Sequence, residues 1–136
     1  MEDYQALFDQ SFDQIIFNTN NSQQFFQRFY DHFIHSNTQV LEKFANTNMT
    51  RQATMLKMSF MTMLEYANTL EETPRLRAIA EVHSRRQVDV TPELYDIWLA
   101  ALTTTIKEVL PNTDEATLQA WRKMLAPGIE YMKSHY

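Results

Sequence analysis

The sequence predicts a single all-α domain over residues 1–136, and its composition and residue spacing support this. One glycine and four prolines leave little material for the tight turns of a β-sheet protein. Hydrophobic residues make up 44% and aromatic residues 12%, so a chain of this length can bury a substantial core. Apolar residues recur at helical spacing, without sustained heptads. We therefore expect a globular fold of seven to eight helices of unequal length rather than an up-and-down bundle.

Four helices are expected in the N-terminal half. The first covers residues 3–17, where apolar side chains recur every three or four positions. The polar run 18–22 breaks it, and Asn21 or Ser22 can cap the second helix by accepting from its free amides. That helix carries five aromatic residues and is expected to break at 35–37. A short helix over 38–44 and a long, methionine-rich helix over 49–70 follow.

Three helices are expected in the C-terminal half. Thr73 can cap a short helix that has Pro74 in its first turn and ends near His83. Thr91 and Pro92 repeat this combination of a cap and a first-turn proline, so another helix is expected to begin at 91–93 and to run to about residue 109. The last helix covers about 114–134 and contains Pro127, which is expected to bend it because proline lacks a backbone donor.

Composition also excludes several classes of function. The net charge of -5 comes without a basic run, so a nucleic-acid-binding protein is not expected. The absence of cysteine excludes disulfides, thiolate metal sites, iron–sulfur clusters and a cysteine nucleophile. No apolar stretch is long enough to span a membrane, and the acidic start does not resemble a secretory signal. We expect a soluble, cytoplasmic protein.

His83 is the most informative residue. It follows Leu76, Ile79 and Ala80 on one apolar helical face and precedes the basic pair Arg85 and Arg86. Histidine is the commonest metal ligand in proteins and the usual proximal ligand of haem iron. A lone histidine is still more often a surface or hydrogen-bonded core residue. If it binds iron, its outer ring nitrogen needs an acceptor, for which the Ile79 carbonyl is the expected partner.

The residues that could face His83 each have an ordinary alternative. On the long helix Gln52 and Leu56 share one face, and core packing explains Leu56 but not a buried glutamine, which would need a partner for its amide. Tyr30 is either a core tyrosine or a hydroxyl donor to a bound ligand. Phe44 is either ordinary core or a ring stacked on a porphyrin. The methionines fit plastic core filling better than axial ligation.

At these residues the chain resembles bacterial single-domain globins and the globin domain of flavohaemoglobins, over nearly its whole length. The order and spacing of the matching positions carry the resemblance. Tyr30, within 29–33, matches the distal tyrosine, and Phe44 matches the phenylalanine that wedges the haem. Gln52, within 49–52, matches the distal glutamine, and Leu56 matches the leucine one turn later. His83, within 81–83, matches the proximal histidine, Tyr95, within 92–95, matches the tyrosine of the following helix, and Trp121 matches a tryptophan of the last helix.

The resemblance implies a globin fold, with the helices in a three-over-three sandwich around haem b (iron protoporphyrin IX). It implies His83 as the iron ligand and a distal side formed by Tyr30, Gln52 and Leu56. Further haem contacts are implied at Phe44, Ile79 and Tyr95. Arg85 and Arg86 are expected to meet the propionates, with Arg51 as a further candidate; for each, a solvated surface charge is the alternative.

The implied function is reversible binding of oxygen, nitric oxide and carbon monoxide at a five-coordinate iron. Dioxygenation of nitric oxide would need a separate reductase, so enzymatic activity stays open. The alternative is a gas or redox sensor that signals to a partner protein in trans, and a third interpretation is a globin-fold module that has lost haem. A monomer and a homodimer are both compatible with the sequence.

Two positions depart from the flavohaemoglobin pattern. The segment between His83 and Tyr95 is slightly longer. Tyr136 falls near the place of a glutamate that joins the proximal network in that family, with Glu130 upstream. The electron-rich proximal side of flavohaemoglobins is therefore not an expectation for this chain.

Overall fold

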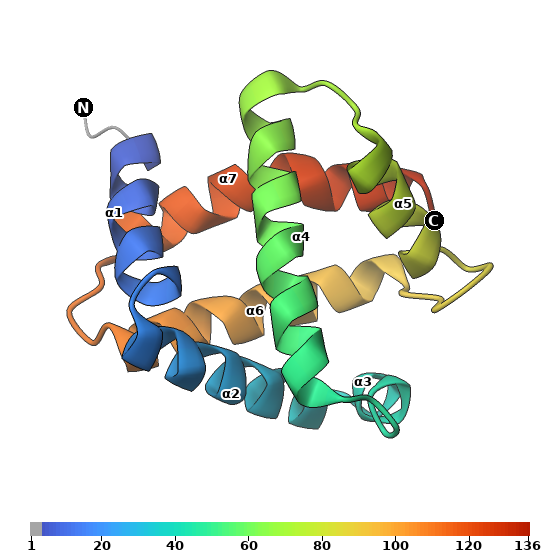
Figure 1. The fold of residues 1–136 in the computed structure, drawn as a ribbon, viewed down its shortest axis with the longest axis horizontal. Helices are drawn as coiled ribbons and strands as arrows, with labels where there is room; N and C mark the ends of the chain where they lie inside the picture. The colour runs from blue at the N-terminus through green and yellow to red at the C-terminus, as the bar shows by residue number, and fades with distance from the viewer. Residues whose placement is uncertain (1–3) are drawn as a thin grey trace. The chain divides into compact units, whose positions relative to one another are not determined.

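The computed structural model describes residues 4–136, which form seven α-helices (Figure 1). The prediction of an all-α globular chain is confirmed, and no strand occurs in this described part. The helices are α1 Tyr4–Ile16, α2 Thr19–Ser36, α3 Thr38–Lys43, α4 Met49–Thr69, α5 Pro74–His83, α6 Pro92–Val109 and α7 Glu115–Ser134.

The chain divides into two compact units, neither of which is a continuous segment. Unit 1 comprises Met1–Ala45 and Ile97–Lys123, and unit 2 comprises Asn46–Asp96 and Met124–Tyr136. The boundaries cross α6 and α7, so both helices contribute to each unit. The prediction of one domain over residues 1–136 stays a prediction.

Unit 1 is built around aromatic side chains. Along the chain α2 follows α1 and packs against both α1 and α3 (Figure 1). Trp121 of α7 is fully buried, and its ring lies 4.8 Å from that of Phe8 on α1. Its indole N–H donates to the buried Ser11 hydroxyl at 2.8 Å. This bond satisfies the one polar group of an otherwise apolar side chain, which lets the indole lie entirely inside the core.

In unit 2, α4 packs against α5 and also contacts α7. A β-carbon added at Gly128 of α7 would lie 2.9 Å from Met63 Cγ and 3.1 Å from Met63 Cβ. That approach is closer than carbon atoms tolerate, so glycine is required for the two helices to come this close. The core of this unit also contains Phe60 and Leu76, both fully buried.

The predicted start of the second helix was wrong. Asn18 is the N-cap of α2, and its side-chain oxygen accepts from the Asn21 amide at 3.1 Å. The Asn21 side chain donates instead to the carbonyl of Gln14 on α1. Several adjacent asparagines can each cap a helix, and this contact with the preceding helix favours the earliest one.

The expected break of that helix at 35–37 is confirmed, and it falls at Asn37. α2 continues through Ser36, because the side chains of His35 and Ser36 bond to carbonyls of their own helix, those of Asp31 and Phe33. Asn37 then ends α2 and caps α3.

The remaining helix boundaries lie close to those expected. Asn48 and Thr73 cap α4 and α5 through side-chain oxygens. α4 ends at Thr69 with Leu70 in the left-handed region at φ 57°. α7 continues through Pro127. No helix in the described range 4–136 is both long enough and apolar enough to cross a membrane.

Candidate functional site

His83 occupies the last position of α5, and its imidazole is held by its own helix. Nδ1 donates to the backbone oxygen of Ile79, one turn earlier, at 2.7 Å. The expected bond to the Ile79 carbonyl is therefore present. A carbonyl oxygen can only accept, so Nδ1 carries the proton and the lone pair of the neutral ring lies on Nε2. This is the tautomer that a histidine needs to ligate a metal through Nε2.

The surroundings of His83 favour its neutral form. The side chain is half-buried, and burial lowers its pKa from the ordinary value, while the bond to Ile79 opposes this in part. Desolvation dominates because a buried imidazolium loses hydration that one carbonyl does not replace. The ring is thus uncharged at neutral pH and available as a ligand.

The backbone of His83 is fixed as well as its ring. Its carbonyl accepts from the Val90 amide at 2.9 Å. Ser84 follows as the C-cap, and its hydroxyl donates to the carbonyl of Glu81 at 2.6 Å. The backbone at the end of α5 is therefore anchored within unit 2.

Gln52 and Leu56 lie one turn apart on α4, also in unit 2. Leu56 is buried at 8% exposure and Gln52 is half-buried. Asn48 accepts from the Arg51 amide at 3.1 Å, which fixes the first turn of the helix that carries Gln52. Arg51 itself is exposed. Gln52 is thus partly exposed near the start of α4, and its carboxamide carries both a donor and an acceptor.

Tyr95 is buried in the first turn of α6, at 7% exposure. Burial raises the pKa of this phenol to about 12. The hydroxyl therefore stays protonated throughout the physiological range and acts as a neutral hydrogen-bonding group.

The two arginines after His83 differ in their contacts. The Arg85 amide and Nε both donate to the carbonyl of Tyr136, at 3.4 and 3.2 Å, and its guanidinium lies 5.0 Å from the centre of the Tyr136 ring. The Tyr136 hydroxyl donates to the carboxylate of Asp89. Arg86 is exposed. No feature of the sequence had indicated the contacts among Arg85, Asp89 and Tyr136.

Tyr30 and Phe44 come together in unit 1. Tyr30 is buried at 6% exposure on α2, and Phe44 ends α3. Their rings meet edge to face with centroids 5.7 Å apart, and Phe29 and Phe33 pack beside them. This aromatic group fixes the direction of the Tyr30 ring.

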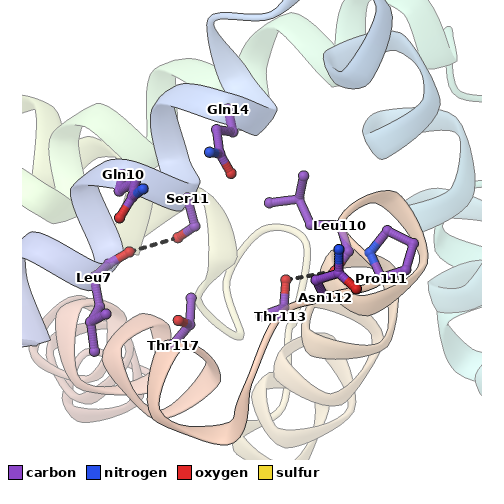
Figure 2. A pocket seen from close by; sticks show the side chains of 9 residues that line it. All are labelled: Leu7, Gln10, Ser11, Gln14, Leu110, Pro111, Asn112, Thr113 and Thr117. Atoms are coloured by element: carbon purple, nitrogen blue, oxygen red, sulfur yellow. Dashed lines mark hydrogen bonds between the residues drawn. The ribbon is translucent and has the colours of Figure 1, made fainter.

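A separate hollow of about 340 Å³ lies in unit 1 between α1 and the segment that joins α6 to α7 (Figure 2). In Figure 2 the Ser11 and Thr113 hydroxyls donate to carbonyls of their own segments, those of Leu7 and Leu110. The lining consists of uncharged residues without histidine: Leu7, Gln10, Ser11, Gln14, Leu110, Pro111, Asn112, Thr113 and Thr117. This hollow contains none of the expected site residues and has no group suited to binding iron.

The globin family model matches residues 7–129. The chain belongs to the globin family. The match covers every expected site residue from Tyr30 to Tyr95, and membership in this family implies haem binding. Within residues 4–136 no three histidine, aspartate or glutamate side chains group as metal ligands.

A solved structure supports the same assignment. This globin is similar to a protein from Pseudomonas aeruginosa described as structurally highly homologous to a human haemoglobin. The two share 36% sequence identity over 98% of each chain, with a TM-score of 0.87. The predicted globin fold is therefore confirmed. A comparison with curated proteins found no match.

Proposed function

We propose that this globin binds haem b through His83 Nε2 and reversibly binds oxygen and other diatomic gases. The observation that carries the proposal is the bond from His83 Nδ1 to the Ile79 carbonyl, which leaves a neutral, half-buried imidazole with its lone pair on Nε2. When bound, haem supplies the iron that takes up the gas.

The residues of unit 2 would hold haem in this proposal. His83 anchors it, and Leu56, Ile79 and the neutral Tyr95 contribute apolar and hydrogen-bonding contacts. Exposed cations are needed near the propionates. Arg85 is already engaged by Tyr136, so Arg86 and Arg51 are the stronger candidates.

Tyr30 and Gln52 would act on the gas ligand, with Phe44 beside the haem. Each would donate a hydrogen bond to an oxygen ligand, and such a bond would be worth about 1.5–3 kcal/mol where the oxygen carries negative charge. Carbon monoxide gains less charge and is stabilised less. This asymmetry predicts tight oxygen binding and slow oxygen release. Dioxygenation of nitric oxide by the same site would require a separate reductase.

The test is the absorption spectrum of the purified, haem-reconstituted protein. The wild type should show a strong Soret band, and His83→Gly should weaken or alter it, with recovery on addition of free imidazole.

His35→Ala is the matched control. His35 Nδ1 also bonds to the carbonyl four residues earlier, that of Asp31, at 2.8 Å, yet this side chain is exposed. Its loss should leave the band unchanged. An unaltered spectrum in His83→Gly would disprove iron ligation by His83.

A further inference from the structure

The turn after His83 folds back onto the end of α5. The Val88 amide donates to the Val82 carbonyl, and the Val90 amide donates to the His83 carbonyl, each at 2.9 Å. Between them, the Asp89 amide donates to the Ser84 carbonyl, also at 2.9 Å. Helix ends leave their last carbonyls without partners inside the helix, and here the turn supplies them. The position of His83 therefore depends on the conformation of residues 84–90.

Asp89 is the strained position in this turn. Its backbone lies in the left-handed region at φ 57°, which a residue with a β-carbon adopts at an energetic cost. Aspartate tolerates this region better than most residues, but such a conformation persists only when surrounding contacts hold it. The Tyr136 hydroxyl provides one such contact, because it donates to the Asp89 carboxylate.

Arg85 fixes Tyr136 from the other side. Its amide and Nε bond to the Tyr136 carbonyl, and its guanidinium stacks over the phenol ring. Tyr136 is thus connected to residues two and six positions after His83. We call Arg85, Asp89 and Tyr136 the Tyr136 clamp.

We propose that Tyr136 is a positioning residue for His83, acting through Arg85 and Asp89 to hold the turn that fixes the end of α5. This inference rests on the proposed function, since it assigns the clamp a role in iron ligation by His83. Loss of the clamp would free the turn, weaken the bond from the Val90 amide to the His83 carbonyl and let the last helical turn shift. The imidazole would then meet the iron in a broader range of orientations.

The experiment compares haem-reconstituted variants of the full chain. Tyr136→Phe removes only the hydroxyl and keeps the ring beside Arg85. Asp89→Ala removes the acceptor, whereas Asp89→Asn keeps an acceptor and a side chain that tolerates the left-handed region. Tyr4→Phe is the matched control, because the exposed Tyr4 ring also has a cation near it, Lys123 Nζ at 5.3 Å.

Three measurements test whether the Tyr136 clamp positions His83. They are the iron–histidine stretching band of the ferrous protein, the rate of haem transfer to an excess of an acceptor apoprotein, and the rate of amide hydrogen exchange at Val90. In Tyr136→Phe and Asp89→Ala the band should shift or broaden and Val90 should exchange faster. Haem transfer should accelerate about twofold to tenfold, as expected for the loss of one hydrogen bond. Asp89→Asn and Tyr4→Phe should resemble the wild type.

The inference is overturned if Tyr136→Phe and Asp89→Ala leave the stretching band and the transfer rate unchanged while the wild type binds haem normally. It is equally overturned if the melting temperature falls but the band does not move, since Tyr136 would then have only a structural role. A wild type that does not take up haem at all would refute the proposed function itself, and this is visible before any variant is made.

Discussion

Replacing Tyr30 by phenylalanine tests the distal side of the proposed site. The Tyr30 ring is buried and makes edge-to-face contacts with Phe29, centroids 5.0 Å apart, and Phe44, 5.7 Å apart. Phenylalanine keeps the ring and these contacts and removes only the hydroxyl. A change in ligand kinetics can therefore be assigned to the lost donor rather than to repacking of the core.

The expected magnitude follows from the strength of one hydrogen bond to a charged acceptor, about 1.5–3 kcal/mol. Since 1.4 kcal/mol corresponds to a factor of about ten, oxygen affinity should fall roughly tenfold to hundredfold. Affinity changes among related complexes arise mostly in the dissociation rate, so oxygen should leave faster by about that factor. Carbon monoxide should be affected much less.

Stopped-flow mixing of the oxygenated protein with excess carbon monoxide measures the oxygen dissociation rate directly. Tyr66→Phe serves as the control, because Tyr66 also packs edge to face on another aromatic ring, that of Tyr131, at 5.4 Å. An oxygen dissociation rate in Tyr30→Phe within twofold of the wild-type rate, with the Soret band intact, would remove Tyr30 from the ligand site.

Three further predictions concern stability and pH. Ser11→Ala removes the hydroxyl that accepts from the buried indole N–H of Trp121 and should lower the free energy of unfolding by about 1–3 kcal/mol in urea titrations at fixed haem concentration. The same substitution should have little effect in a Trp121→Phe background. Gly128→Ala should cost about 1–2 kcal/mol, because the added carbon would press on Met63; a gain in thermal stability would contradict this. Tyr95 has a pKa of about 12 in the folded protein against about 10 when unfolded, so its contribution to stability is complete below pH 10 and is lost as the pH rises towards 12. In Tyr95→Phe this alkaline loss should shrink. The absorbance titration at about 295 nm should then lose one of its two late-ionising phenols and keep the other, Tyr131, whose pKa is also raised to about 12.

Local chemistry made much of this protein predictable from its sequence. The bond from His83 to the Ile79 carbonyl follows from the geometry of a single helical turn, and the cap at Thr73 follows from a side chain beside the amide from which it accepts. The start of α2 was misplaced because neighbouring asparagines are chemically equivalent as caps, and a contact with α1 distinguishes them.

Long-range contacts could not be predicted in the same way. The bond from Tyr136 to Asp89 joins residues 47 apart, and the bond from Trp121 to Ser11 joins residues 110 apart. Neither pair has a spacing or motif that marks it, because the meeting of such side chains depends on the path of the whole chain. The roles of Tyr30, Gln52 and His83 towards haem and gas stay predictions, supported by the family match.

The interleaving of the two units along the chain has a consequence for biosynthesis. Unit 1 cannot be completed until residue 123 has been translated, and unit 2 cannot be completed until the segment from Met124 onward follows. A nascent chain that has emerged only as far as α5 therefore exposes apolar surfaces whose covering helices do not yet exist. Ribosome-bound intermediates of this length should depend on chaperones, and a stalled or prematurely terminated chain should be degraded rather than accumulate as half a protein.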